Sequence, residues 1–220
     1  MEACCGPPDD PRRYDDVFDE RFARRVARRY RDRGATAVER RLVDFAVDHG
    51  LHGATVLEVG GGVGELQLEL LDHGAARTVN LELSHEYEQE AQRLIAAAGF
   101  GGRVARTVGI DVARHPESVP HADLVLLNRV VCCYPEAQRL LSAAASRADR
   151  AIAFSHPRRN WATRLIAALE NLMYRAGGRS YRAYIHDPES LCDAIRRAGF
   201  EIEAREPGFM WCVVGAVRRT

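Results

Sequence analysis

The sequence contains no lysine, so all 31 of its basic residues are arginine. Mechanisms that need a lysine amine, as a Schiff base or as a general base, are therefore excluded. The arginines are balanced by 31 acidic residues, and the formal net charge is zero. This balance gives no global indication of a nucleic-acid or membrane partner, and we expect neither.

Long apolar runs are also lacking. No segment has the length that spans a bilayer, and residues 1–13 have no apolar core that resembles a signal peptide. The six cysteines include the vicinal pairs Cys4-Cys5 and Cys132-Cys133, which is not the pattern of a secreted disulfide framework. We therefore expect free thiols and a cytoplasmic protein. Because the histidines and cysteines show no metal-ligand spacing, we expect no metal site.

Short apolar segments alternate with longer amphipathic ones along most of the 220 residues. This rhythm predicts an α/β fold with a Rossmann-like, seven-stranded, mostly parallel sheet and helices on both faces. A Pro-Gly turn at 207–208 predicts that the chain ends in an antiparallel hairpin. Residues 1–35 are expected to form an arm and an arginine-rich helix that caps the domain of residues 36–220, with a helical insertion at about 158–187. The strands are expected at 54–59, 78–83, 103–108, 123–128, 151–155, 202–205 and 210–217.

The strongest functional signal is the run Val56-Leu57-Glu58-Val59-Gly60-Gly61-Gly62-Val63-Gly64, a strand that ends in a glycine turn before a helix. Glycines at such a turn allow a ligand to approach the backbone closely. Glu82 ends the second strand, Asp111 follows the third, and the fourth ends in Asn128-Arg129, so all these features lie at the carboxyl ends of strands, where open α/β sheets bind ligands.

The ligand at this edge is open to two interpretations. A nicotinamide-dependent (NAD(P)) oxidoreductase places a pyrophosphate at the start of the helix. Here Glu58 and Glu65 flank the glycines, and two carboxylates favour a cation over a phosphate. The full Gly-x-Gly-x-x-Gly run of a dinucleotide site is also absent. A sulfonium ligand with an α-amino group is therefore favoured, and the oxidoreductase remains the alternative.

The glycine run resembles motif I of the class I S-adenosylmethionine-dependent methyltransferases, and residues 80–84, 109–111 and 123–134 resemble their next motifs. The resemblance covers residues 36–217 and implies S-adenosylmethionine as cofactor and S-adenosylhomocysteine as product. Residues 128–135 and 155–157 are also similar to magnesium-protoporphyrin methyltransferases, a similarity from which we take no substrate. The implied cofactor residues are Glu58, Gly60, Gly61, Gly62, Glu82, Leu83, Asp111, Val112 and Asn128.

The resemblance also implies methyl transfer to an oxygen, nitrogen or sulfur atom of a small-molecule acceptor. The protein then mainly positions and desolvates the acceptor, and a base is needed only if the acceptor loses a proton. His156 and Tyr134 are the candidates for that base, although His156 serves equally well as a loop cap. We expect the acceptor to contact Arg129, Tyr134, His156 and Arg158.

Three further features have both a functional and a plain structural interpretation. Cys132-Cys133 suggest a thiophilic metalloid acceptor such as arsenic, shared with Cys4-Cys5, but two buried thiols that pack behind the site are the favoured interpretation. The arginines between Arg21 and Arg33 are either a lid for an anionic acceptor or, as we favour, a solvated helix face. The aromatic residues Trp161, Tyr174, Tyr181 and Tyr184 line a pocket or belong to the core.

Overall fold

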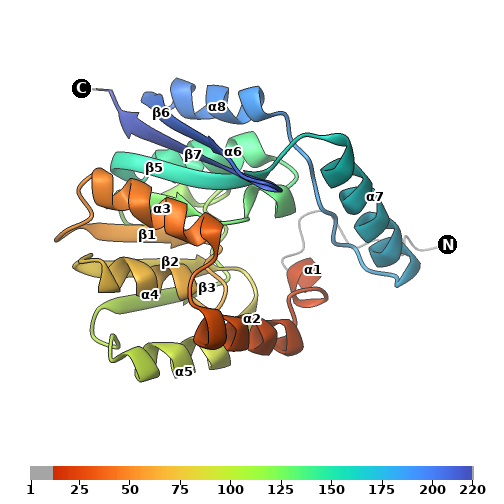
Figure 1. Cartoon of the computed structure of the whole chain (residues 1–220), viewed down its shortest axis with the longest axis horizontal. Helices are drawn as coiled ribbons and strands as arrows, with labels where there is room; N and C mark the ends of the chain where they lie inside the picture. The colour runs from red at the N-terminus through yellow and green to blue at the C-terminus, as the bar shows by residue number, and fades with distance from the viewer. Residues whose placement is uncertain (1–11, 220) are drawn as a thin grey trace.

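The computed structural model describes residues 12–219, which form one seven-stranded sheet covered by helices on both faces (Figure 1). The strand order is β3-β2-β1-β4-β5-β7-β6. Neighbouring strands from β3 to β5 run parallel, and β7 is antiparallel to both β5 and β6. The prediction of a Rossmann-like, mostly parallel sheet with a terminal antiparallel hairpin is confirmed.

The strands are short apolar segments that end at or near glycine or polar residues, and the helices lie between them. The strands are β1 (Thr55–Val59), β2 (Arg77–Glu82), β3 (Val104–Val108), β4 (Ala122–Leu127), β5 (Ala148–Pro157), β6 (Phe200–Pro207) and β7 (Trp211–Arg218). The helices are α1 (Arg12–Asp15), α2 (Glu20–Arg33), α3 (Ala37–Asp48), α4 (Glu65–Asp72), α5 (Glu88–Ala98), α6 (Ala137–Ala145), α7 (Trp161–Ala176) and α8 (Pro188–Arg197), with 3-10 turns η1 (His85–Tyr87), η2 (Pro116–Ser118) and η3 (Val131–Cys133).

Two apolar layers hold the helices against the sheet. On one face, α3 and α4 pack on alternate residues of the central strands, among them Val56 and Leu124. On the other face, α6 and α8 pack on the intervening residues, such as Leu57 and Val125. A parallel sheet buried on both faces explains why these strands are apolar runs with little alternation.

From β1 the sheet is built outward in two directions: β2 and β3 lie on one side of β1, and β4 and β5 lie on its other side. The loops that leave β1 and β4 therefore diverge to opposite faces and open a crevice at the carboxyl ends of these strands. This is the edge at which the sequence predicts the ligand. The three features that the sequence places after β2, β3 and β4 all reach the same edge.

The N-terminal helical region and strand β5 differ in their bounds from the sequence prediction. Within the predicted N-terminal cap, α1 and α2 are separate helices, because Asp19 caps α2 by accepting a hydrogen bond from the N–H of Phe22 at 2.8 Å. Strand β5 continues beyond Ser155 to Pro157, because it pairs with β7 over its whole second half. Among residues 12–219, none of the helices combines the length and the apolar character that crossing a membrane requires.

Candidate functional site

A cavity of about 610 Å³ lies at the carboxyl ends of β1, β2 and β4. Its floor is the loops that follow these strands, and its walls come from α2, α7 and the chain around Tyr14 and Tyr181. Figure 1 shows α1, α2 and α7 grouped at this end of the molecule, away from the opposite ends of the strands. Every residue predicted to bind the cofactor lines the cavity: Glu58, Gly60, Gly61, Gly62, Glu82, Leu83, Asp111, Val112 and Asn128.

The glycine turn between β1 and α4 is required by the packing of the protein itself. Gly60 has φ 66°, and a Cβ there would lie 2.6 Å from a methyl carbon of Val130. A Cβ on Gly61 would lie 1.9 Å from the side-chain nitrogen of Asn80 and 2.6 Å from the carboxylate of Glu58. From the sequence, these glycines are expected to let a ligand approach the backbone. The structure shows that side chains of the protein already exclude larger residues at Gly60 and Gly61.

Glu82 ties this turn to the end of β2. Its carboxylate accepts hydrogen bonds from the backbone N–H groups of Gly62 at 2.8 Å, Leu83 at 2.8 Å and Ser84 at 3.0 Å. Burial raises the pKa of Glu82, and these three donors oppose that rise. A carboxylate has about four acceptor positions. Glu82 therefore holds the loop in place and keeps acceptor capacity toward the cavity that it lines.

Three further carboxylates meet beside the glycine turn: Glu39 from α3, Glu58 from β1 and Glu65 from α4. Burial, with the charge of Glu65 as the next cause, raises the pKa of Glu58 well above its usual value. Burial and the charge of Glu39 raise the pKa of Glu65 to about 7. Arg29 lies 3.5 Å from Glu39 and 3.7 Å from Glu65, which offsets part of this negative charge. A site with buried carboxylates in excess favours a cationic ligand.

Asn128 and Arg129 form the turn after β4. The side-chain oxygen of Asn128 accepts a hydrogen bond from the Ser155 hydroxyl at 3.1 Å, and its amide donates to Glu39 at 3.3 Å. Among the described residues other than glycine, Arg129 alone has a positive φ, of 58°. Its N–H donates to the Ser155 hydroxyl at 2.7 Å, and its guanidinium lies 5.2 Å from the ring centre of Trp211. A non-glycine residue in this backbone region is strained, and such strain is concentrated at functional sites.

Asp111 is already engaged by a tyrosine. The Tyr134 hydroxyl donates to one carboxylate oxygen of Asp111 at 2.8 Å, while the other oxygen accepts from the N–H of Ala113 at 2.9 Å. Burial and this hydrogen bond raise the pKa of Tyr134. A phenol that donates to a carboxylate and has a raised pKa stays protonated at neutral pH. This geometry suits Tyr134 to orienting Asp111 better than to accepting a proton.

The structure does not bring His156 and Arg158 into the cavity. Neither is among the described residues that line it. His156 is buried within β5, opposite Cys212 of β7, with its Nδ1 atom 2.9 Å from the carbonyl of Pro157. Arg158 donates to the carbonyl of Gly208 at 3.3 Å. Sequence analysis expects a loop after Ser155, whereas pairing with β7 keeps these residues at the hairpin.

Aromatic residues close the cavity, and the sequence gives only a partial signal for them. The ring of Phe18 lies 5.5 Å from that of Phe22 and 5.3 Å from that of Tyr181, and Tyr174 lies 5.2 Å from Tyr181. The four-residue spacing of Phe18 and Phe22 predicts one apolar helix stripe, but only Phe22 lies on α2, and Phe18 precedes it. Both rings lie beside that of Tyr87. The contact of Phe18 with Tyr181, a residue beyond α7, depends on the tertiary fold. Glu39 is similarly hidden, because its role in the capping box with Thr36 accounts for it locally.

The vicinal cysteines lie in the cavity wall. The sulfur atoms of Cys132 and Cys133 are 3.6 Å apart, and the Tyr181 hydroxyl donates to the sulfur of Cys133 at 3.0 Å. Hydrogen bonds from Cys132 and then from Tyr181 lower the pKa of Cys133. Cys4 and Cys5 lie outside the described residues. Within residues 12–219, no cluster of three or more histidine, cysteine or acidic side chains is placed to hold a metal ion.

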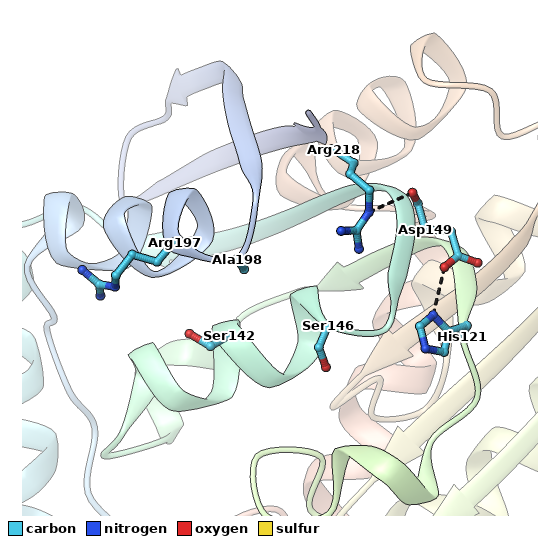
Figure 2. Close-up of a pocket in the computed structure, with 7 residues that line it drawn as sticks. All are labelled: His121, Ser142, Ser146, Asp149, Arg197, Ala198 and Arg218. Carbon is cyan, nitrogen blue, oxygen red and sulfur yellow. Dashed lines mark hydrogen bonds and ion pairs between the residues drawn. The ribbon is translucent and has the colours of Figure 1, made fainter. Parts of the chain in front are cut away.

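A second hollow lies at the opposite ends of the strands (Figure 2). His121 and Asp149 form its rim, with His121 Nδ1 2.9 Å from the Asp149 carboxylate. Arg218 donates to the backbone carbonyl of Asp149 at 3.1 Å, as Figure 2 shows. His121, Asp149 and Arg218 are exposed, and none of the sequence-predicted site residues lies there. The 610 Å³ cavity is therefore the candidate site.

Known proteins resemble this chain in two ways. Residues 22–205 match the family described as "Methyltransferase domain". The fold is similar to magnesium protoporphyrin IX methyltransferase from Synechocystis PCC 6803, solved with bound S-adenosylhomocysteine (TM-score 0.75, 23% identity, 96% of this chain and 100% of that one). It is also similar to an O-methyltransferase family protein from Burkholderia thailandensis (TM-score 0.69, 21% identity, 93% of this chain and 64% of that one). A third similar structure is the cyclase SpnF (TM-score 0.61, 16% identity, 82% of this chain and 80% of that one). No curated protein matches in sequence.

Proposed function

This chain belongs to the methyltransferase domain family, as the match over residues 22–205 shows, and we propose that it transfers a methyl group from S-adenosylmethionine to a small-molecule acceptor. One observation carries the proposal. The buried carboxylates of Glu39, Glu58 and Glu65 lie in the same cavity as the carboxylate of Glu82, at the carboxyl ends of adjacent parallel strands. A ligand with a cationic end and a ribose matches this arrangement, and S-adenosylmethionine has both.

The residues present fit that cofactor. Glu58, the backbone of Gly60–Gly62 and Asn128 would hold the methionine part, whose ammonium and sulfonium groups complement the excess of carboxylates. Glu82, which keeps acceptor capacity after its three backbone contacts, would accept the ribose hydroxyls. Leu83 and Val112 would flank the adenine, and Asp111 would accept from its amino group beside the bond from Tyr134. A dinucleotide fits less well, because its pyrophosphate would meet the same carboxylates.

The cofactor supplies an activated methyl group with a neutral thioether as the leaving group. The protein's own contribution is to orient the two reactants and to exclude water. Phe18, Phe22, Tyr174 and Tyr181 form an apolar wall above the polar floor, which lowers the local dielectric. None of the described residues that line the cavity is a histidine. We infer that positioning, rather than an imidazole base, drives the transfer.

Residues 12–35, the described part of the predicted cap of residues 1–35, would cover this site, and residues 158–187 would form the acceptor side. One wall of the cavity comes from Phe18, Phe22, Arg25 and Arg29, and another from Glu170 and Tyr174, which supports this division.

The described cysteines are free thiols, which supports a reducing compartment, and we propose the cytoplasm. These cysteines are Cys132, Cys133, Cys192 and Cys212.

Calorimetric titration with S-adenosylhomocysteine tests the proposal. We expect 1:1 binding to the wild type, no heat with NAD+, and binding weaker by roughly 10- to 100-fold in Glu82→Gln, since a lost hydrogen bond to a charged group costs about 1.5–3 kcal/mol. Glu86→Gln changes an exposed neighbour and should bind as the wild type does. Binding of NAD+ instead, or equal affinity in Glu82→Gln, would contradict the proposal.

Methyl transfer itself is tested with labelled S-adenosylmethionine and a panel of small molecules that offer hydroxyl, amine and thiol acceptors. Label that moves to a panel member identifies the acceptor class. The cyclase SpnF shares the fold, so cofactor binding without transfer to any member would point to a cyclase-like or non-catalytic use of the site.

The cysteine pair supports a second candidate function, transfer to a thiophilic metalloid. Cys132 and Cys133 place two sulfur atoms 3.6 Å apart in the cavity wall, where they could hold such an atom near the methyl donor. Arsenite in the same labelling assay, with Cys132→Ser and Cys133→Ser as paired variants, tests it. No transfer to arsenite would dismiss this candidate, whereas transfer that both variants abolish would establish it.

A further inference from the structure

Helix α7 turns an apolar face to the solvent. Trp161 is 79% exposed, Leu172 is 63% exposed and Met173 is 71% exposed. Leu165, Ile166 and Leu169 are exposed as well. A helix at the surface of a globular domain normally presents polar residues on its outer side. The exposed side of α7 therefore needs a covering that the chain itself does not supply among the described residues.

The inner side of α7 is already accounted for. Thr163 and Ala167 are buried, and Glu170 and Tyr174 line the cavity. At about 100° per residue, these four positions share one side of the helix, and the opposite side carries Trp161, Leu165, Leu169 and Leu172. The helix is therefore fixed to the domain by its less apolar side. A helix displaced from its proper packing partner would show the reverse arrangement.

The apolar surface continues onto the hairpin between β6 and β7. Phe209 in that turn is 92% exposed. The N–H of Arg158 donates to the carbonyl of Met210 at 2.9 Å, which holds the turn beside the start of α7. Figure 1 shows α7 standing clear of the sheet at this end of the molecule. Trp161 and Phe209, each large and aromatic, thus belong to neighbouring segments of one surface.

Positive charge accompanies this surface, although the chain as a whole is neutral. Residues 158–182 contain six arginines and one acidic residue, Glu170, which lines the cavity. Arg164 and Arg175 border the exposed side of α7, and neither forms an ion pair with any described residue. An apolar helix face bordered by unpaired cations has the chemistry of a segment that lies in the headgroup region of an anionic bilayer.

We infer that α7, with Phe209 beside it, docks on the surface of an anionic lipid membrane. The apolar side chains would enter the boundary between headgroups and acyl chains, and Arg164 and Arg175 would reach the lipid phosphates. Sequence analysis expects no membrane partner, because it finds neither a spanning run nor a net positive charge. Neither observation bears on a helix that lies along the interface, and the inference is independent of methyl transfer.

Vesicle sedimentation with the full chain tests the inference. We expect at least tenfold more protein on vesicles that contain about 30% phosphatidylglycerol in phosphatidylcholine than on phosphatidylcholine alone, since each arginine near an anionic surface contributes about 1 kcal/mol. High salt should reduce the difference. The double variant Leu165→Glu/Leu172→Glu should lose vesicle binding at least tenfold. Val47→Glu, an equally polar change at an exposed position of α3, should bind as the wild type does.

Two readouts keep the result interpretable. Melting temperature and S-adenosylhomocysteine binding show that each variant is folded, because Leu165 and Leu172 do not line the cavity. A blue shift of tryptophan emission on anionic vesicles, lost in Trp161→Phe, reports insertion directly. Absence of the wild type from anionic vesicles would overturn the inference. So would light scattering that shows a dimer which Leu165→Glu/Leu172→Glu disrupts, since a second copy would then cover this face.

Discussion

Glu65 offers a quantitative test of the acidic cluster, because the pKa of its carboxyl lies near neutrality. Burial and Glu39 raise this pKa from 4.5 to about 7. A shift of about 2.5 units corresponds to roughly 3 kcal/mol, at about 1.4 kcal/mol per unit. Because the pKa is raised in the folded state, the contribution of Glu65 to the free energy of unfolding is complete below pH 4.5. It is lost as the pH rises to about 7. The cofactor-free protein should lose stability across that window.

The substitution Glu65→Gln removes this titration. At pH 8 the cofactor-free variant should be more stable than the wild type by up to about 3 kcal/mol. About 0.3–1 kcal/mol is subtracted from this gain, because the Glu65 carboxylate in the first turn of α4 interacts favourably with the helix dipole and the variant loses that interaction. At pH 5 the two proteins should be nearly equal. Denaturant unfolding at pH 5, 6, 7 and 8 measures this difference, with Glu86→Gln as the exposed control.

Cofactor affinity should change in the opposite sense. Ionised Glu65 attracts the ammonium group of the ligand, so wild-type affinity for S-adenosylhomocysteine should rise from pH 6 to about 7.5. At alkaline pH the amino group of the ligand loses its proton and affinity should fall again. Glu65→Gln should bind more weakly at pH 7.5 and should lack the rise. A stability difference between variant and wild type that stays constant from pH 5 to pH 8 would refute this reasoning.

Three further variants test the remaining parts of the site. Gly61→Ala should lower the free energy of unfolding by roughly 1–3 kcal/mol, because its Cβ would overlap Asn80. Gly101→Ala, whose Cβ would meet nothing within 4 Å, is the control, and an equal loss in both variants would contradict the packing argument. Tyr134→Phe should weaken S-adenosylhomocysteine binding by roughly tenfold, about the value of one hydrogen bond to a charged group, and should leave the pH dependence of label transfer unchanged. If the variant instead loses a rise of the transfer rate with pH, Tyr134 is a base. His156→Gln should keep binding and label transfer within about twofold, since His156 lies outside the cavity, and a hundredfold loss of transfer would restore its catalytic role.

The sequence was sufficient to predict the sheet and the floor of the site, because local signals determine both. Short apolar runs bounded by glycines mark the parallel strands, and parallel strands bring their carboxyl ends to one edge. Glu58, Glu82, Asp111 and Asn128 reach the same cavity for that reason alone. The wall of the cavity was less predictable. Glu39 has a complete local explanation as a helix cap, so only the tertiary fold shows that it also lines the cavity.

Long-range strand pairing explains why His156 lies outside the cavity. His156 follows an apolar run and reads as a loop residue, but its partner Cys212 lies more than fifty residues further along the chain. The exposed side of α7 is a comparable case. The apolar spacing from Trp161 to Met173 indicates an amphipathic helix, but the tertiary fold buries the side that carries Thr163 and Ala167 instead of the apolar side.

The structure of a crystal grown with S-adenosylhomocysteine tests the central claim most directly. Our account predicts density for the ligand between the glycine turn and β2, with its ribose hydroxyls within hydrogen-bond distance of Glu82 and its amino group near Glu58. A ligand bound elsewhere, or an empty cavity at saturating concentration, would contradict the assignment.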